Sequence, residues 1–190
     1  MKIFCDMDGV LVNFLGGLHK ALGLPYDYDH YPYTLGKWNM LTDMGGFKNF
    51  KLPFSIINGV CTADFWANLE WMHDGHDIWR AILERFDPKD IYLLTTPMPN
   101  TGSASGKMMW VEKHLPDFVD RTIITRAPKH LLADGGRLLI DDRDKNVTDW
   151  YAIGCGYPIP VPRPWNRAFD RRDTTLEAVT DWLDFAVGAA

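Results

Sequence analysis

Short apolar runs, each ending in acids or hydroxyls, are the feature that most constrains the fold of this chain. Runs this short favour buried strands over helices. They alternate with stretches in which apolar residues recur at helical spacing, as in residues 14–22, 78–86, 107–115 and 176–187. Strands that alternate with helices predict a parallel sheet covered by helices on both faces. The predicted strands are residues 2–5, 90–97, 122–125 and 138–142.

Four other segments complete the predicted organisation. Residues 147–153 fit a short helix, and residues 157–161 an extended segment that its prolines restrict to a sheet edge. Residues 98–106, rich in Gly, Ser and Pro, predict a loop. Residues 26–64 have weak periodicity and many Tyr, Gly, Pro and Asn residues. We therefore expect a Rossmann-like three-layer α/β core of residues 1–14 and 78–190, with a small, mostly helical cap of residues 15–77.

Polar side chains gather at the predicted strand ends. In parallel α/β sheets, ligands bind beyond the carboxyl ends of the strands. The sequence thus places six polar residues around one crevice, namely Asp6, Asp8, Thr95, Thr96, Asp141 and Asp142. Two acids at a buried strand end repel each other, which is costly without a cation. A metal site is therefore a better interpretation of these acids than a purely structural role.

The same residue types supply what phosphate-ester hydrolysis requires. Asp6 can attack phosphorus, and Asp8, two residues further on, can act as general acid and then base. Gly9 allows a sharp turn behind them. Asp141 offers hard oxygen ligands for Mg²⁺ together with Asp6. Thr95 can donate a hydrogen bond to a phosphoryl oxygen, and a lysine must balance the charge. That lysine is predicted to be Lys129.

The order of these motifs resembles that of a known superfamily. Asp6-Met7-Asp8-Gly9-Val10-Leu11, Leu94-Thr95, Lys129 and Ile140-Asp141-Asp142 look like the four ordered motifs of the haloacid dehalogenase superfamily. Further segments are similar to the 5'(3')-deoxyribonucleotidases, from about residue 3 to residue 145 with gaps. They include the run from Asp6 to Gly17, Phe65-Trp66-Ala67-Asn68-Leu69-Glu70, Leu94-Thr95-Thr96-Pro97 and Lys107-Met108-Met109-Trp110-Val111-Glu112-Lys113.

The resemblance implies a role for each matching residue. Asp6 would be the nucleophile and a metal ligand, and Asp8 the acid and base, with its backbone carbonyl on the metal. Asp141 would bind Mg²⁺ with Asp142 beside it. Phe14 and aromatic residues of the cap, for which we select Phe47, would pack on the base and sugar. Phosphate contacts are expected from Thr95, Thr96, Lys107 and Lys129.

The chain also departs from the family pattern at several positions. The acid that follows Val-Leu-x in the family is Asn13 here. Lys145 replaces the acid four residues after Asp141, with Asp144 and Asn146 beside it. The segment from Leu69 to Gly75 lacks the family's prolines. These departures leave the reaction better supported than the substrate.

Composition excludes several other classes of protein. A formal net charge of −5 argues against binding of long nucleic acid. The first residues do not read as a signal peptide, and no apolar run approaches the roughly 20 residues of a membrane span. Cys5, Cys61 and Cys155 have no spacing typical of zinc sites or disulfides. We therefore expect a cytoplasmic protein with reduced thiols.

We expect a Mg²⁺-dependent phosphatase that hydrolyses (deoxy)ribonucleoside monophosphates through an aspartyl-phosphate intermediate. Two alternatives stay open. One is a phosphatase for another small monoester, such as a sugar phosphate or a nucleic-acid 3'-phosphate end. The other is a binding protein that keeps this scaffold without catalysis. The sequence leaves the oligomeric state open, with a homodimer as one option.

Overall fold

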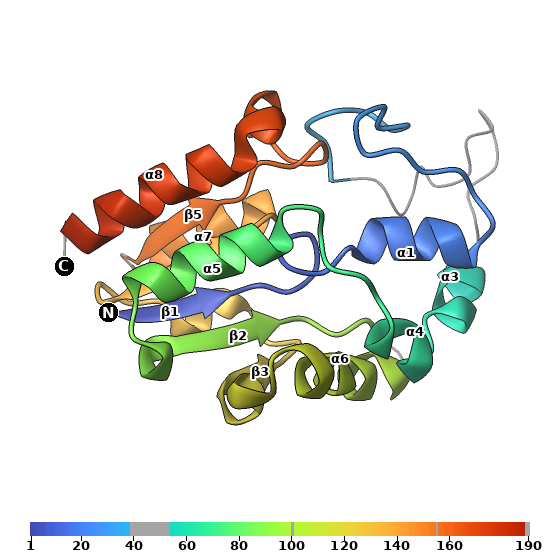
Figure 1. Cartoon of the computed structure of the whole chain (residues 1–190), viewed down its shortest axis with the longest axis horizontal. Coiled ribbons are helices and arrows are strands. Elements are labelled where there is room, and N and C mark those ends of the chain that lie inside the picture. The colour runs from blue at the N-terminus through green and yellow to red at the C-terminus, as the bar shows by residue number, and fades with distance from the viewer. Residues whose placement is uncertain (39–53, 100, 155, 189–190) are drawn as a thin grey trace.

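The sheet lies at the centre of the molecule. The structure, a computed structural model, describes residues 1–38, 54–99, 101–154 and 156–188. Within these residues, five parallel strands pair in the order β3-β2-β1-β4-β5 (Figure 1). This arrangement confirms the predicted α/β fold with a parallel sheet. The strands are β1 (Lys2–Cys5), β2 (Ile91–Thr95), β3 (Thr122–Ile124), β4 (Arg137–Asp141) and β5 (Tyr157–Pro160).

Helices connect and cover the strands. Short 3-10 helices add Pro88–Asp90, Pro116–Arg121, Lys129–Leu132 and Phe169–Thr174. None of the helices in the described ranges is long and apolar enough to cross a membrane. The α-helices are α1 (Phe14–Ala21), α3 (Phe54–Val60), α4 (Ala63–Ala67), α5 (Gly75–Arg85), α6 (Thr101–His114), α7 (Asp144–Gly154) and α8 (Thr175–Gly188).

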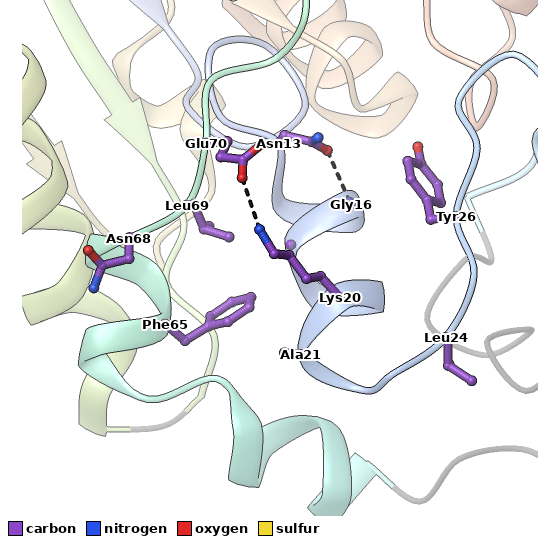
Figure 2. Close-up of a pocket in the computed structure, with 11 residues that line it drawn as sticks. Asn13, Gly16, Lys20, Ala21, Leu24, Tyr26, Phe65, Asn68, Leu69 and Glu70 are labelled. Atoms are coloured by element: carbon purple, nitrogen blue, oxygen red, sulfur yellow. Dashed lines mark hydrogen bonds and ion pairs between the residues drawn. The ribbon is translucent and has the colours of Figure 1, made fainter.

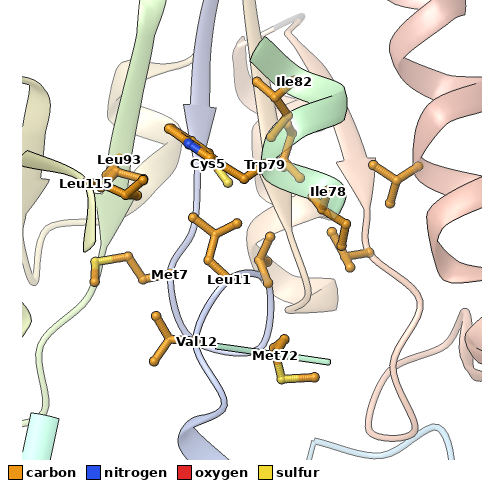
Figure 3. Packing of buried hydrophobic residues seen from close by; sticks show 14 of the residues in the cluster. Cys5, Met7, Leu11, Val12, Met72, Ile78, Trp79, Ile82, Leu93 and Leu115 are labelled. Atoms are coloured by element: carbon orange, nitrogen blue, oxygen red, sulfur yellow. The ribbon is translucent and has the colours of Figure 1, made fainter. Parts of the chain in front are cut away.

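The strands β1, β2 and β4 are buried on both faces of the sheet, which is why their sequences are continuous apolar runs. On β1, Ile3 and Cys5 point into the larger core, which also contains residues of α5 and α8 (Figure 3). Phe4 points the opposite way and packs on Trp150 of α7, with 5.6 Å between ring centroids. Alternate residues of one strand thus anchor helices on opposite faces.

Strand register decides which polar residues meet beyond the sheet. Cys5 of β1 pairs with Ile140 of β4, and the Asp6 N–H donates to the Ile140 carbonyl at 2.9 Å. The next residue of each strand is an aspartate, so Asp6 and Asp141 leave the sheet side by side. On the other side of β1, β2 runs further and ends at Thr95.

Strand β5 forms an edge of the sheet, as its prolines predict. The Val161 N–H, just after the strand, donates to the Asp141 carbonyl at 3.0 Å. Because backbone N–H positions alternate in direction along a strand, the backbone nitrogens of Pro158 and Pro160 point away from β4, toward the outer edge of the sheet. Because proline lacks an N–H, the outer edge offers no donor at these two positions, which blocks pairing with a further strand.

Two local predictions were wrong. Helix α6 begins at Thr101, so the loop predicted for residues 98–106 is helical in its second part. The small residues there serve close packing, since a Cβ at Gly106 would overlap the backbone carbonyl of Ala63 in α4. In α8, the helical spacing of apolar residues in 176–187 predicts one buried face with Val179, Trp182, Leu183 and Val187, but Trp182 and Val187 are exposed.

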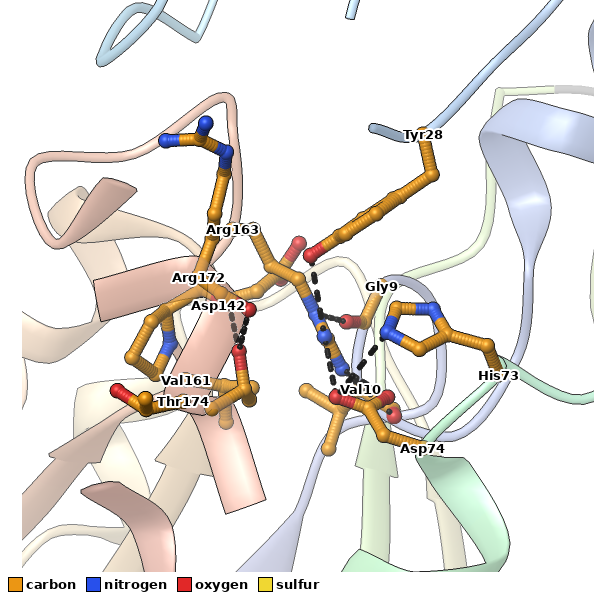
Figure 4. A network of polar contacts seen from close by, with 12 residues as sticks. Gly9, Val10, Tyr28, His73, Asp74, Asp142, Val161, Arg163, Arg172 and Thr174 are labelled. Atoms are coloured by element: carbon orange, nitrogen blue, oxygen red, sulfur yellow. Dashed lines mark hydrogen bonds and ion pairs between the residues drawn. The ribbon is translucent and has the colours of Figure 1, made fainter. Parts of the chain in front are cut away.

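A buried ion pair ties three distant segments together behind the turn that follows β1 (Figure 4). Arg163 lies in the segment after β5 and is fully buried. Its guanidinium donates to both carboxylate oxygens of Asp74, at 2.7 and 2.8 Å. Its Nε donates to the Gly9 carbonyl at 2.6 Å, and a weaker bond of 3.4 Å reaches the Val10 carbonyl. The Arg163 side chain thus holds the turn through the backbone carbonyls of Gly9 and Val10.

Replacing Ile3 by alanine tests the central position of β1. Ile3 is fully buried, so we expect the free energy of unfolding to fall by about 2–5 kcal/mol. The matched control is Ile153→Ala in α7, where the isoleucine is 62% exposed; its effect should stay within about 0.5 kcal/mol. Urea denaturation followed by tryptophan fluorescence measures both. Equal losses in the two variants would contradict the placement of Ile3.

The Arg163–Asp74 pair is tested by removing one partner and then both. Arg163→Met leaves the Asp74 carboxylate buried without its cation, so we expect a loss of about 3–5 kcal/mol in unfolding free energy. The double variant Arg163→Met/Asp74→Leu removes the unpaired charge and should regain part of that loss. Arg80→Met, which breaks an exposed ion pair with Asp77, is the control and should cost at most about 1 kcal/mol. A double variant no more stable than Arg163→Met would refute this account.

Candidate active site

The turn after β1 brings two aspartates to the sheet edge. The N–H groups of Leu11 and Val12 both donate to the Met7 carbonyl at 2.8 Å, which closes a tight loop. Gly9 sits in this loop with φ of +75°, a conformation that favours glycine. A side chain at Gly9 would also overlap the carboxylate of Asp142. The glycine of the Asp-x-Asp-Gly motif is therefore required by local geometry.

Three buried carboxylates form the centre of the site. Asp6, Asp141 and Asp142 each offer an oxygen, and these oxygens lie within 4.8 Å of one another. Lys129 Nζ lies 2.8 Å from Asp6 Oδ2 and 2.7 Å from Asp141 Oδ2. Lys129 is buried too, so it binds the two carboxylates with little competition from water. The predicted charge-balancing lysine thus lies between the two predicted metal ligands.

The charges of this group are only partly balanced. Burial raises the pKa of Asp141 to about 6, although Lys129 counteracts the shift. Burial, then the charges of Asp141 and Asp6, raise the pKa of Asp142 well above its ordinary range. Burial lowers the pKa of Lys129, but Asp141 and Asp6 raise it by more, so the lysine stays charged. One monovalent cation thus faces three carboxylates.

A divalent cation fits these residues. Asp142 Oδ1 is buried and has no hydrogen-bond partner among the described residues. An unpaired buried carboxylate oxygen is costly, and a hard cation is the partner that such oxygens accept most readily. The group therefore has both the ligand type and the excess negative charge that a metal such as Mg²⁺ requires.

Asp8 lies beside the carboxylate group and is held by a different lysine. Lys107 Nζ donates to Asp8 Oδ2 and, at 2.8 Å, to Thr95 Oγ1. Lys107 is buried and also lies over the ring of Trp66, 4.7 Å from its centroid. Burial raises the pKa of Asp8 more than the charge of Lys107 lowers it. This environment favours a carboxyl group that can carry a proton.

The two adjacent threonines have different environments. Thr95 is fully buried and is bound to Lys107. Thr96 is exposed and lines a separate cavity, to whose wall Lys129 also contributes. The structure therefore groups Thr95 with Asp8 and Lys107, and Thr96 with this separate cavity.

An aromatic cavity adjoins Asp8 and Asp142. Phe14 stacks on Trp66 with ring centroids 4.8 Å apart and an interplanar angle of 3°. Phe47, the other predicted substrate contact, lies outside the described residues. The cavity measures about 120 Å³. Its lining consists of Asp8, Gly9, Phe14, Leu15, Trp38, Trp66, Met72, Met98, Asp142 and Trp165.

The departures from the family pattern have structural explanations. Asn13 caps α1, since its Oδ1 accepts the Gly16 N–H at 3.0 Å, a role that asparagine and aspartate fill equally well. Asn146 Nδ2 donates to both oxygens of Asp141, at 3.1 and 3.0 Å. Lys145 is turned to solvent and pairs with Asp149. The amide of Asn146 thus holds Asp141 from the helix that follows it.

The segment after β5 also holds the site, which the sequence motifs did not indicate. Trp165 Nε1 donates to Asp142 Oδ2 at 2.6 Å. Asn166 Nδ2 donates to the carbonyls of Asp142 and Val161, both at 2.7 Å. The sequence gives no spacing signal for these contacts, because Trp165 and Asn166 lie more than 20 residues after Asp142 in the chain.

A wider cavity lies between α1 and α4 (Figure 2). It measures about 650 Å³, and Lys20 and Glu70 pair at 3.1 Å on its wall. None of the predicted site residues in the described ranges lines it. Its polar groups are largely paired with one another, so size alone does not make it the reactive site.

Comparisons with known proteins agree with this geometry. A protein-family model described as "5' nucleotidase, deoxy (Pyrimidine), cytosolic type C protein" matches residues 1–186. The cytosolic-type 5'(3')-deoxyribonucleotidase of Homo sapiens is 29% identical over 147 residues, which cover 76% of this chain and 71% of that protein. The mitochondrial 5'(3')-deoxyribonucleotidase of Mus musculus is 27% identical over 150 residues, which cover 75% and 64% of the two chains.

The family match spans nearly the whole chain, and it includes both the strand-end carboxylates and the segment after β5 that holds them. The resemblance seen in the sequence motifs is thereby confirmed. The chain belongs to the cytosolic type C family of 5' deoxynucleotidases, within the haloacid dehalogenase superfamily, and is a phosphoric monoester hydrolase.

Proposed function

We propose that this enzyme hydrolyses nucleoside monophosphates, preferentially those of deoxyribose, to nucleoside and phosphate. The observation that carries the proposal is the position of the Asp6–Lys129–Asp141 group beside Asp8 and an aromatic cavity. The site thus combines a nucleophile, an acid and a surface suited to a base. The names of the human and mouse relatives support the same substrate class.

In the first step, an Asp6 carboxylate oxygen attacks phosphorus as the bond from phosphorus to the ester oxygen breaks. Asp8 gives its proton to the departing ester oxygen, which leaves as the nucleoside hydroxyl. The Met7 N–H, 2.8 Å from Asp6 Oδ1, and Lys129 on Oδ2 hold the Asp6 carboxylate in place. The product of this step is an aspartyl-phosphate on Asp6.

In the second step, water attacks the phosphorus of the aspartyl-phosphate, and the bond between phosphorus and the Asp6 oxygen breaks. Asp8, now ionised, takes the proton from the water. Orthophosphate leaves, and Asp6 and Asp8 return to their starting states. Lys107 supports both steps, because it binds Asp8 and Thr95 at once and so fixes their relative position.

We propose Mg²⁺ as the metal, held by Asp6 and Asp141 with the backbone carbonyl of Asp8, and with Asp142 beside it. When bound, the ion supplies positive charge that offsets the repulsion between the carboxylates and the phosphoryl oxygens. Phosphate contacts are assigned to Thr95, Thr96, Lys107 and Lys129. Trp165 and Asn146 keep Asp142 and Asp141 in place through their N–H groups.

Phe14 is the proposed contact for the base, together with Trp66, on which it stacks. Flat aromatic faces bind bases without regard to their identity, so this pair selects a base as a class. Phe47 keeps its proposed role as a second substrate contact. We retain residues 15–77 as the proposed cap over a core of residues 1–14 and 78–190. The cytoplasmic location and the homodimer stay predictions.

Replacing the nucleophile tests the reaction. Purified Asp6→Asn should release phosphate from deoxyribonucleoside monophosphates with kcat lower by a factor on the order of 10⁴, because the amide oxygen is a poor nucleophile. Asp181→Asn, at an exposed position on α8, is the control and should keep its activity.

The same assay should cover 5'- and 3'-monophosphates of all common nucleosides and a set of sugar phosphates. Preference for a sugar phosphate would overturn the substrate class. Undiminished turnover in Asp6→Asn would overturn the covalent mechanism. Release from none of the substrates by the unaltered protein would favour a binding role.

Removal of the metal gives an independent test. EDTA should stop phosphate release, and added Mg²⁺ should restore it. Mg²⁺ at about 100 times its Kd should also stabilise the fold by about 2.7 kcal/mol, seen as a higher Tm. Asp141→Asn should lose this rise in Tm, whereas Asp181→Asn should keep it. The same rise in both variants would show that the ion binds elsewhere.

A further inference from the structure

The cavity lined by Thr96 and Lys129 lies beside the carboxylate group, which Lys129 also contacts. It measures about 180 Å³ and opens at the same edge of the sheet. Asp6, Asp8 and Thr95 do not line it, so it is separate from the proposed nucleophile and proton donor. Two proposed phosphate contacts, Thr96 and Lys129, do line it. Its lining comes from the segments that follow β2, β3 and β4, namely Thr96, Arg126, Ala127, Pro128, Lys129, His130, Arg143, Lys145, Asn146 and Asp149.

The cavity concentrates positive charge on an acidic protein. Four of its lining residues are lysine or arginine, whereas Asp149 is the only acid among the lining residues that the structure describes. Asp149 is already engaged by Lys145 at 2.5 Å and by His130 at 3.6 Å. The formal net charge of the whole chain is −5. Such a local excess of positive charge attracts anions.

Two arginines in this cavity have no acidic partner among the residues that the structure describes. In the described ranges, no carboxylate pairs with the guanidinium of Arg126 or with that of Arg143. Arg126 is exposed, in a turn where Thr125 Oγ1 accepts the Ala127 N–H at 3.0 Å. Arg143 is anchored by its backbone N–H, which donates to Asp141 Oδ1 at 2.8 Å, and its guanidinium lies 5.4 Å from the ring of Trp38. Both guanidinium groups can therefore donate hydrogen bonds to an oxyanion.

The size and position of the cavity indicate which anion it takes. Pockets that hold drug-sized ligands measure roughly 300–1,000 Å³, so this cavity suits a small ion better than a whole nucleotide. Guanidinium groups bind phosphate oxygens in pairs and with directional hydrogen bonds. Lys129 belongs both to the wall of the cavity and to the carboxylate group. The cavity and the Asp6 carboxylate therefore lie on either side of one shared residue, Lys129.

We propose that this cavity, built around Arg126 and Arg143, binds inorganic phosphate as a product site separate from the reacting atoms. The inference rests on the proposed function for its source of phosphate. After hydrolysis, phosphate binds in this cavity before it is released to solvent. When phosphate from solution already fills the cavity, release of the newly formed phosphate slows, so the product inhibits the enzyme.

The first test measures binding without catalysis. Inorganic phosphate is titrated by calorimetry into the full chain in EDTA, where the uncompensated carboxylates repel phosphate from the reactive centre. The double variant Arg126→Gln/Arg143→Gln should bind phosphate at least about tenfold more weakly, because two charge-assisted contacts are lost. The control Arg80→Gln/Arg171→Gln makes the same change in net charge at exposed ion pairs elsewhere and should bind like the unaltered protein.

Phosphate affinity that is equal in the double variant and the unaltered protein, or no phosphate binding by the unaltered protein, would overturn the proposal. Because this arm needs no turnover, its result is independent of the proposed function. If the protein is inactive but binds phosphate through these arginines, the phosphate site is supported and the proposed function is overturned. If the protein is active but does not bind phosphate there, the proposed function is supported and the phosphate site is overturned.

The second test separates product from substrate. With Mg²⁺ present, the inhibition constant for phosphate should rise in the double variant by a larger factor than KM for the nucleotide. Parallel rises in both constants would show that the two arginines bind the phosphate group of the substrate, and would overturn a separate product site.

Discussion

Lys129 and the two carboxylates that it joins are the interaction on which the site depends. Parallel pairing of β1 and β4 forces Asp6 and Asp141 to leave the sheet side by side, where burial and like charge oppose ionisation. Lys129 contacts both, and Asn146 adds hydrogen bonds to Asp141. Without these cationic and amide partners, the strand ends could not hold two ionised carboxylates. The remaining negative charge is compatible with a divalent cation at this group.

A second set of contacts fixes the loops that carry these carboxylates. Arg163, Trp165 and Asn166 lie close together in the segment after the edge strand, and they bind the Gly9 carbonyl, the Asp142 side chain and the Asp142 backbone. Each contact joins positions far apart in the chain. The segment that follows the edge strand β5 thus crosses back over β4 and contacts the turn after β1. Reactive groups held in this way keep their geometry without help from the substrate.

The sequence predicted the parts of this arrangement that follow from local pattern. The strands predicted at residues 2–5, 90–97 and 138–142 overlap β1, β2 and β4, although β2 ends two residues earlier than predicted and β4 one residue earlier. Asp6, Thr95 and Asp141 therefore emerge at one edge of the sheet, because parallel strands end on the same side. The sequence did not predict the contact of Arg163 with Asp74 or of Trp165 with Asp142, since neither pair has a spacing or composition signal. The start of α6 was missed for a related reason. Gly102 and Gly106 read as loop residues, but in three dimensions they allow close approach of α4.

The two buried lysines divide the site into two chemical environments. Lys129 contacts the two carboxylates of Asp6 and Asp141 and so places one positive charge between them. Lys107 is shared between Asp8, a neutral hydroxyl and the face of Trp66, and burial still raises the pKa of Asp8. Two aspartates only two residues apart thus lie in different environments, which fits the proposed division of tasks between a nucleophile and a proton donor. Sequence spacing brings the two aspartates together, but the other partners of each lysine make their environments different.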